Sequence, residues 1–299
     1  MLIQENTSLV NLISAEYHAR SSWQDGILSF PIDRLSLGIQ ANAYYFGHRQ
    51  WAQNYLEAVH RDQEFQDRWL AMTGSWENKI VVDIGCGPGN VFAALRDRCG
   101  TPAQLIGVDV ARGGLEIAAE LGYTPVLADA QQLPFVSDFA DIVVINGTLH
   151  HCDDMQRVLQ EAARIVRSGG LLITDHDLQK TMWHDNAIAH WLWNFRLPLY
   201  RLLKRGGHAT QEEQAWMVAT EVHHSPGDGV TPEFFYDTLD PMGFSVKLFP
   251  HNRTIGAEVL QGECGRSAWN IRLAQWLSGV NPNSTESALV MMCVAQRSL

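Results

Sequence analysis

The sequence predicts an α/β protein built on a doubly wound, mostly parallel sheet, and three observations support this fold class. Short apolar runs alternate with stretches of helical spacing between residues 79 and 176. A glycine-rich turn, at residues 85–89, follows the first apolar run and leads directly into a helical stretch. Aspartates lie at the ends of successive runs, where the carboxyl ends of parallel strands would bring them to one edge of a sheet.

Seven apolar runs have the length and boundaries of strands, so we expect a sheet of seven strands. They are residues 79–84, 105–109, 125–128, 141–146, 171–175, 244–249 and 288–295. Helical spacing separates them at residues 91–95, 112–121, 154–167 and 232–239. This alternation of strand and helix is typical of crossover connections between parallel strands.

Residues 1–76 precede the first strand and have helical spacing with many aromatics, so we expect an N-terminal helical layer there. One side of a predicted helix in this layer carries Trp51, Tyr55, Leu56 and Val59. Residues 77–299 would form the core. Two intervals in the core, at about 178–231 and 251–286, are longer than a crossover helix needs, so we expect them to be helical cap insertions.

The chain has 299 residues, with 33 acidic and 22 basic side chains and a formal net charge of -11. This charge repels a polyanionic backbone, so we do not expect a nucleic-acid partner. No apolar stretch is long enough for an integral membrane segment, and residues 1–14 lack the features of a secretory signal. We therefore expect a cytoplasmic protein. Its five scattered cysteines are expected to be reduced thiols.

The glycine turn offers bare backbone N–H groups to a ligand at the start of a helix. Dinucleotide-binding turns favour a third glycine where this chain has Asn90, and Asp83 precedes the glycines at the strand end. A carboxylate there would repel a pyrophosphate but attract the α-ammonium group of a methionine moiety. The turn therefore argues against a nicotinamide cofactor.

Two further aspartates follow the second and third predicted strands. Asp109 is placed where ribose hydroxyls need an acceptor, and Asp129 is placed to accept from an adenine amino group. Any one of these aspartates is more often a cap or turn residue than a ligand contact. Three of them at successive strand ends favour a ligand site.

The run Asp83-Ile84-Gly85-Cys86-Gly87-Pro88-Gly89 resembles the DxGxGxG first motif of class I S-adenosylmethionine-dependent methyltransferases of the small-molecule type. Asp109 matches the family's acidic position on strand two, and Asp129-Ala130 with residues 133–135 is similar to its third motif. The similarity covers roughly residues 79–176. It implies S-adenosyl-L-methionine as the cofactor and a Rossmann-like methyltransferase sheet of seven strands whose last strand runs antiparallel.

The resemblance and the strand ends together give a set of expected cofactor contacts. They are Asp83, Gly85, Cys86, Gly87, Asp109, Val110, Asp129, Ala130, Asn146 and Gly147. Similar enzymes fold their N-terminal layer over the cofactor, where Arg49 would be able to pair with the methionine carboxylate. For Arg49, as for Tyr44, Tyr45 and Trp51, we nevertheless favour a core or surface role.

Methyl transfer from a sulfonium is an in-line displacement, so catalysis rests chiefly on holding the acceptor against the methyl carbon. A hydroxyl or ammonium acceptor also needs a general base, and histidine suits neutral pH. The candidate catalytic residues are His151, His150 and His176, which follow the fourth and fifth predicted strands. Capping of the next helix, beside Asp153 and Asp154, is the alternative for the histidine pair.

We expect no bound metal. His150, His151, Asp175, His176 and Asp177 have suitable donor atoms, but side chains on neighbouring strand residues point to opposite faces of a sheet. The remaining histidine pairs, His184 with His190 and His223 with His224, lack partners at helical ligand spacing. We interpret them as exposed or cap-packing histidines.

Residues 182–203 form an aromatic run that would cover the acceptor site if it folded back over the sheet. Its aromatic residues are Trp183, Trp191, Trp193, Phe195 and Tyr200. An acceptor site covered by these aromatic residues would favour a hydrophobic acceptor. Packing on the N-terminal helices and a homodimer interface are alternatives. A membrane-surface contact is a further one, because basic residues flank the run at Arg196, Arg201, Lys204 and Arg205.

The sequence thus predicts transfer of a methyl group from S-adenosylmethionine to a small, hydrophobic or aromatic metabolite. One alternative is an enzyme that binds S-adenosylmethionine without methylating, such as a cyclase or isomerase, and release of S-adenosylhomocysteine would separate the two. Another is a regulatory module that keeps the cofactor pocket. Tight cofactor binding without any methylated product would favour that module.

Overall fold

The computed structural model describes residues 7–203 and 210–299, and its centre is a nine-stranded sheet in the order β1-β2-β5-β4-β3-β6-β7-β9-β8. The strands are β1 Ser22–Gln24, β2 Ile27–Ser29, β3 Ile80–Ile84, β4 Gln104–Asp109, β5 Thr124–Leu127, β6 Ala140–Asn146, β7 Val166–Asp175, β8 Phe244–His251 and β9 Val290–Arg297. Strands β5, β4, β3, β6 and β7 are parallel, and β9 runs antiparallel to both of its neighbours. The predicted fold class and its antiparallel last strand are confirmed.

The sheet has two strands more than the seven predicted, because the N-terminal layer is not wholly helical. Strands β1 and β2 form a hairpin whose turn residues, Asp25 and Gly26, both have positive φ. Strand β2 then adds to the parallel edge of β5, with Leu28 opposite Val126. Each hairpin strand is three residues long and β1 is exposed throughout, so neither leaves a periodic apolar pattern in the sequence.

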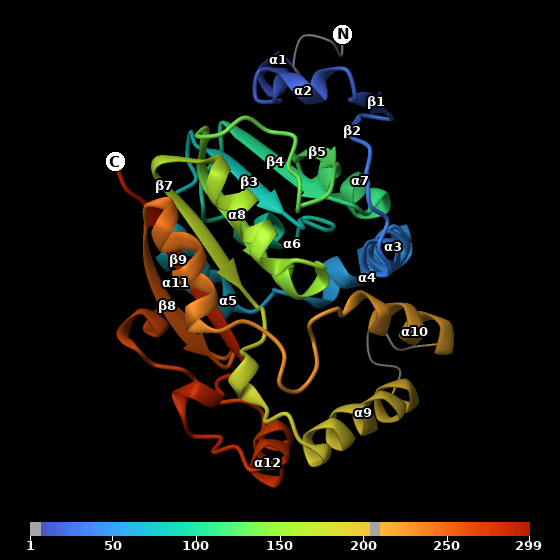
Figure 1. The fold of residues 1–299 in the computed structure, drawn as a ribbon, viewed down its shortest axis with the longest axis vertical. Helices are drawn as coiled ribbons and strands as arrows, with labels where there is room; N and C mark the ends of the chain where they lie inside the picture. Colours follow the sequence, from blue (N-terminus) through green and yellow to red (C-terminus); the bar gives the residue numbers. More distant parts are fainter. Residues whose placement is uncertain (1–6, 204–209) are drawn as a thin grey trace.

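Helices cover both faces of the sheet and extend beyond one end of it (Figure 1). The α-helices are α1 Thr7–Val10, α2 Ala15–His18, α3 Leu37–Tyr45, α4 Arg49–Ala58, α5 Gln63–Thr73, α6 Asn90–Leu95, α7 Arg112–Glu120, α8 Met155–Ile165, α9 Ala187–Leu202, α10 Gln211–Thr220, α11 Pro232–Leu239 and α12 Trp269–Leu277. Five 3₁₀ turns join them in the described ranges, namely η1 Leu149–His151, η2 Lys180–Met182, η3 Asp240–Met242, η4 Ala257–Gln261 and η5 Thr285–Ser287. Helix α8 ends before the predicted residue 167, because Val166 already begins β7.

Two buried apolar clusters hold the sheet between its helical layers. Alternate residues of β3 belong to opposite clusters, with Val82 and Ile84 on one face and Val81 on the other, as the pleat of a strand requires. All three side chains are fully buried. The strands are therefore fixed along their length, and their carboxyl tips have defined positions.

The two long insertions lie beyond the carboxyl ends of the strands, where α9, α10 and α12 form the lower part of the molecule in Figure 1. Polar side chains begin α9 and α10, since Asn186 Oδ1 accepts from the Ala189 amide at 2.9 Å and Thr210 Oγ1 accepts from the Glu213 amide at 3.0 Å. Trp191 of the aromatic run is 62% exposed, so α9 does not bury all of its aromatic residues.

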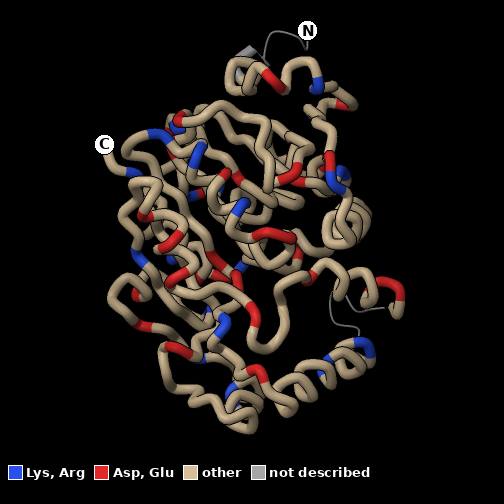
Figure 2. Tube along the Cα trace, in the orientation of Figure 1, with Lys and Arg blue, Asp and Glu red and all other residues tan. Residues whose placement is uncertain are grey.

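Charged residues are spread over many elements (Figure 2). Of the basic residues that flank the aromatic run, Arg196 and Arg201 lie in α9, whereas Lys204 and Arg205 lie outside the described residues. Within the described ranges no helix combines the length and the hydropathy that crossing a membrane requires.

Candidate functional site

The glycine turn between β3 and α6 adopts backbone conformations that favour glycine. Gly85, Gly87 and Gly89 have φ angles of +68°, +50° and +87°. A Cβ atom at Gly85 would lie 2.2 Å from Thr148 Cγ2. The turn therefore packs directly against the loop after β6, and any larger residue at position 85 would force that loop to move.

One cavity, which we call the rim cavity, opens between this turn and the tips of β4, β5 and β6. Every one of the ten residues predicted to contact a cofactor lines it. The N-terminal layer closes it with side chains that sequence reasoning did not single out, namely Ile39, Asn42, Phe46 and His60. Tyr55, which had been assigned only to a helix face, lines it as well. The free volume of the rim cavity is about 100 Å³.

Two carboxylates on the rim are oriented by backbone amides. Asp109 Oδ2 accepts from the Gly87 amide and its Oδ1 from the Ala111 amide, both at 2.8 Å. Asp129 Oδ1 accepts from the Gln131 amide, also at 2.8 Å. Each carboxylate oxygen has a second lone pair, so both groups keep acceptor capacity for a ligand.

Asp83 lies deeper than the other two aspartates and has only 1% of its surface exposed. The Tyr123 hydroxyl donates to Asp83 Oδ2 at 2.7 Å. Burial raises the pKa of Asp83 to about 7, against the opposing effect of this hydrogen bond. A cationic group in the rim cavity would favour the ionised form of Asp83.

Two amide oxygens on the wall of the rim cavity are buried without a hydrogen-bond partner among the described residues, Asn90 Oδ1 and Asn146 Oδ1. The Asn146 amide nitrogen lies 2.9 Å from His60 Nε2, which fixes the direction of its oxygen. Unpaired buried acceptors are costly, so the cavity is suited to a ligand that donates hydrogen bonds.

Arg49 does not lie in the rim cavity. Its guanidinium is bound by α7, at 2.6 Å from Glu120 Oε1 and 3.6 Å from Glu116 Oε2. The structure thus gives Arg49 the surface role that the sequence favoured, and it does not place Arg49 where it would meet a cofactor carboxylate. Tyr45 is buried, and Tyr44 packs on Trp216 of α10 with ring centroids 4.3 Å apart.

The three candidate catalytic histidines lie in different surroundings. His151 lines the rim cavity, and its Nδ1 lies 2.7 Å from the Thr220 carbonyl oxygen. His150 does not line the rim cavity, and its Nδ1 lies 2.7 Å from Asp177 Oδ1. Burial lowers the pKa of His150 to about 3 and that of His151 to about 4, so both rings are neutral at pH 7.

His176 lies apart from the other two, in a recess that it shares with His60, Arg68 and Arg253. The carboxylate beside it, Asp175, is fully buried between Arg68 Nε at 3.1 Å and His251 Nε2 at 2.8 Å. Asp175 and Asp177 therefore serve different partners, and the structure does not unite the five residues considered as metal donors.

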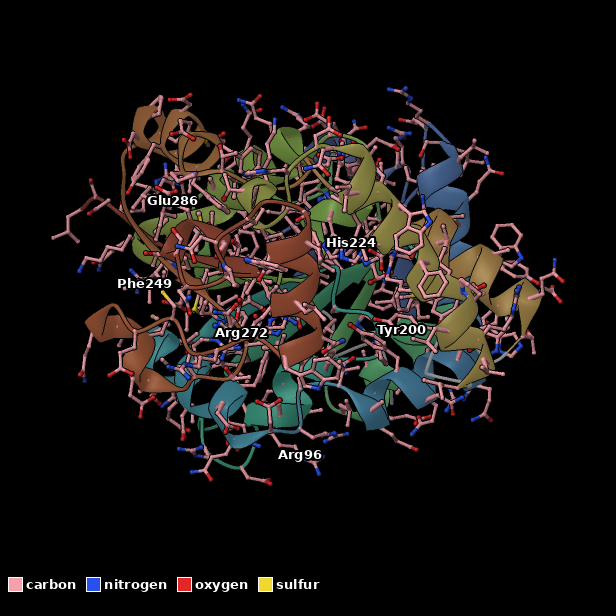
Figure 3. All side chains as sticks on the ribbon, turned by 90° about the horizontal axis from the view of Figure 1, so that it is seen from below. Arg96, Tyr200, His224, Phe249, Arg272 and Glu286 are labelled. Atoms are coloured by element: carbon pink, nitrogen blue, oxygen red, sulfur yellow. The ribbon has the colours of Figure 1, made fainter. Side chains whose placement is uncertain are left out.

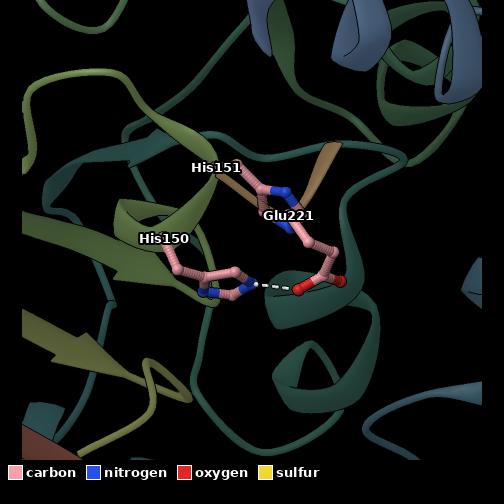
Figure 4. Close-up of side chains that lie close together, drawn as sticks. All are labelled: His150, His151 and Glu221. Carbon is pink, nitrogen blue, oxygen red and sulfur yellow. Dashed lines mark ion pairs between the residues drawn. The ribbon is translucent and has the colours of Figure 1, made fainter. Parts of the chain in front are cut away.

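Helix α10 brings an unpredicted carboxylate, Glu221, to the histidine pair. His150 Nε2 lies 3.6 Å from Glu221 Oε2, with His151 beside them (Figure 4). His224 also contacts Glu221, and its ring stacks on His150 with centroids 5.0 Å apart. His223 Nδ1 lies 3.1 Å from Asp228 Oδ2, five residues away. His224 follows its partner Glu221 by three residues, so the prediction that these histidines lack partners at helical spacing was wrong for His224.

A second cavity, the cap cavity, lies among α9, α10 and α12 and has a free volume of about 580 Å³. Figure 3 views the molecule from this side and shows two of its lining residues, His224 near the centre and Tyr200 on α9. Its walls are mostly aromatic and aliphatic, including Trp183, Trp193 and Phe195. Glu221 and His224 line the cap cavity, whereas His151 lines the rim cavity. These three residues and His150, which we call the histidine cluster, therefore lie between the two cavities.

Comparison with known proteins finds methyltransferase similarity in the same region. A family model described as a methyltransferase domain matches residues 82–174. A demethylmenaquinone methyltransferase from Bacillus licheniformis is 24% identical over 152 residues, which cover 49% of this chain and 66% of the relative. A malonyl-[acyl-carrier protein] O-methyltransferase from Hamiltonella defensa is 30% identical over 123 residues, which cover 41% of this chain and 47% of the relative.

The chain thus spans about half to two thirds of the length of these relatives. Among solved structures, geranyl diphosphate C-methyltransferase from Streptomyces coelicolor A3(2) is similar with a TM-score of 0.53 and 13% sequence identity. That similarity covers 90% of this chain and 100% of the other, and it shows a shared fold.

Proposed function

We propose, from the match of residues 82–174 to a methyltransferase domain model, that this chain transfers a methyl group from S-adenosylmethionine to a small apolar acceptor. The observation that carries the proposal is the rim cavity. It combines a bare glycine turn, three aspartates at strand tips and unpaired amide oxygens in one space. These groups suit a ligand that has hydroxyl and amino donors together with a positive charge.

The rim cavity fits S-adenosylmethionine by the chemistry of its walls. Asp109 would accept from the ribose hydroxyls, and Asp129 with Ala130 would lie at the adenine end. Asp83, Asn90 and Asn146 would face the α-ammonium group with acceptor atoms only. The free volume of about 100 Å³ is below the several hundred Å³ of typical ligand pockets, so side chains of α3 and α4 must shift outward on binding.

The cap cavity is our candidate site for the acceptor. Its free volume of about 580 Å³ and its apolar walls suit a hydrophobic or aromatic metabolite. The histidine cluster between the two cavities would bring the reacting atom of the acceptor toward the rim cavity. The methyl group is transferred to a nitrogen or oxygen that has a free lone pair, or to a carbon that is a carbanion.

The chemistry asks little of the protein beyond position and exclusion of water. The acceptor's electron pair forms a bond to the methyl carbon while the bond from carbon to sulfur breaks, and the sulfonium becomes a neutral thioether. A hydroxyl or ammonium acceptor loses a proton in this step. The neutral ring of His151 is our candidate to take it, because its Nδ1–H donates to the Thr220 carbonyl and its Nε2 keeps a lone pair.

Calorimetric titration of the chain with S-adenosylmethionine and with S-adenosylhomocysteine tests the cofactor. We expect saturable binding of both with one site per chain. Incubation with methyl-labelled S-adenosylmethionine and a panel of hydrophobic alcohols, phenols and acids then tests transfer. Saturable binding of neither compound would overturn the proposal, and binding without label transfer would favour a regulatory module.

A further inference from the structure

We propose that His150, His151 and Glu221 form a binding site for a first-row divalent transition metal such as Zn²⁺. One donor atom from each of the three side chains lies within 4.8 Å of the other two. Two imidazoles and one carboxylate make a donor set that Zn²⁺, Fe²⁺ and Co²⁺ accept in proteins. Figure 4 shows the three side chains converging from two separate segments, η1 and the end of α10.

The two imidazoles are held as metal-binding histidines usually are. His150 Nδ1 lies 2.7 Å from Asp177 Oδ1, and His151 Nδ1 lies 2.7 Å from the Thr220 carbonyl oxygen. Each ring therefore donates its Nδ1–H outward to an oxygen and keeps its Nε2 lone pair for the cluster. Ligating histidines almost always donate their other ring N–H to a carboxylate or a backbone carbonyl in this way.

The charge at the cluster also favours a cation. The Glu221 side chain is only 15% exposed, and its ion-pair contacts within the described residues are to His150 and His224 alone. Helix α10 ends at Thr220, so its carbonyl end and the negative end of its dipole face the same point. A divalent ion would compensate both the carboxylate and the helix end.

The sequence argument against a metal assumed that His150 and His151 lie on a strand. The structure places them in the 3₁₀ turn η1, where neighbouring side chains do not alternate between the faces of a sheet. Glu221 lies 70 residues after His151 along the chain and reaches it only through the folded insertion. The site is therefore invisible as a spacing pattern in the sequence.

This site would act on the acceptor, and in that respect the inference rests on the proposed function. Three protein ligands leave coordination positions open for water or for an acceptor oxygen or nitrogen. With the ion bound, His151 is a ligand rather than a base. The ion would lower the pKa of a bound acceptor hydroxyl, which would release its proton to solvent water. The site selects acceptors that carry an oxygen or nitrogen donor beside the methylated atom.

Cobalt and zinc titrations test the site directly. The full chain is dialysed against a chelator, and Co²⁺ is then added while the visible absorption of the ion is recorded. We expect one bound ion per chain with the spectrum of mixed nitrogen and oxygen ligation, displaced by one equivalent of Zn²⁺. The variants His150→Gln and Glu221→Gln should each weaken Zn²⁺ binding in calorimetry by tenfold or more.

Asp177→Asn provides a second, independent variant, because it changes a hydrogen bond to a ligand and leaves all three ligands in place. We expect it to weaken Zn²⁺ binding by ten- to a hundredfold. His190→Gln is the matched control, since His190 Nε2 contacts Asp185 at 2.7 Å in an exposed histidine–carboxylate pair that includes none of the three proposed ligands. Unchanged Zn²⁺ affinity in folded His150→Gln and Glu221→Gln variants, or equal loss in His190→Gln, would overturn the metal site.

The outcome is separable from that of the proposed function. Binding of S-adenosylmethionine by the wild-type chain is measured in the same samples with and without Zn²⁺. Cofactor binding without specific metal binding would remove the metal site and leave methyl transfer intact. Specific metal binding without cofactor binding would support the metal site and overturn the proposed methyl transfer.

Discussion

The rim cavity and the histidine cluster are built in different ways. The rim cavity takes its polar groups from a glycine turn and from strand tips, so each group lies close in sequence to the strand that positions it. The cluster joins η1 with the end of α10, and these segments meet only after the insertion has folded. A site of the first kind is specified by local sequence, whereas a site of the second kind depends on tertiary packing.

Among the changes that test this contrast, we expect the largest loss of stability at Gly85, whose backbone conformation shapes one wall of the rim cavity. Gly85→Ala should lower the free energy of unfolding by about 2 to 5 kcal/mol, since left-handed backbone strain adds to overpacking against Thr148. Urea denaturation measures it. Gly26→Ala is the control, because Gly26 has φ of +80° but no atom within 4 Å of an added Cβ. Equal losses in the two variants would show that the contact with Thr148 is unimportant.

A smaller effect is expected at Asp109. Asp109→Ala should weaken S-adenosylmethionine binding by roughly 1 to 3 kcal/mol through lost hydrogen bonds to the ribose, without unfolding the protein. Zn²⁺ binding at the histidine cluster should stay within about twofold of the wild type, because we expect the rim cavity and the cluster to bind their ligands independently. Calorimetry with each ligand gives both numbers. Unchanged cofactor affinity would exclude Asp109 from the cofactor site.

Asp83, in the rim cavity, should make the stability of the fold depend on pH. Its pKa in the folded chain is about 7, whereas in the unfolded chain it takes the ordinary value near 3.8. Between these values the folded state holds a proton that the unfolded state has released, so the Asp83 contribution destabilises the fold progressively as pH rises from about 4 to 7. The slope is at most about 1.4 kcal/mol per pH unit.

Urea denaturation of the wild type and of Asp83→Asn between pH 5 and 8 isolates this contribution. The variant should gain stability relative to the wild type up to about pH 7 and show a constant difference above it. S-adenosylmethionine should also bind the wild type more tightly above pH 7, where an ionised Asp83 meets its ammonium group. A difference in stability that does not change with pH would contradict the assignment.

The smallest effect is expected at Arg49, which belongs to neither region. Arg49→Gln should lower stability by less than about 1 kcal/mol, because its ion pairs with Glu116 and Glu120 are half exposed. Cofactor affinity should stay within about twofold of the wild type in calorimetry. A tenfold loss of cofactor affinity would show that Arg49 contributes to the cofactor site, contrary to its position on the helix surface.

The sequence predicted the sheet well where apolar runs are long and bounded by turns. Strands β3 to β9 and helices α6, α7, α8 and α11 lie within a few residues of their expected bounds, except that β7 begins five residues early, at Val166. The ten expected contacts share one cavity because parallel strands bring their carboxyl tips to one edge.

The parts that sequence reasoning missed depend on contacts between distant segments. The β1–β2 hairpin is too short to show a pattern, and its place is set by pairing with β5. A surface role was favoured for Arg49, but its partners were not predicted, because nothing in its own helix indicates the glutamates of α7. Glu221 and His224 gain their partners only when the insertion packs on η1, a contact that local spacing does not encode.

The position of β9 has a consequence for how the chain reaches its fold. Val290–Arg297 fills the slot between β7 and β8, where Leu171 pairs with Gln296 and Leu248 with Cys293. Pairings so remote in sequence raise the contact order and slow folding. Until β9 inserts, the apolar edge of β7 stays unpaired. Insertion of β9 should therefore be a slow step of refolding, and aggregation of the partly folded chain should begin at that open edge.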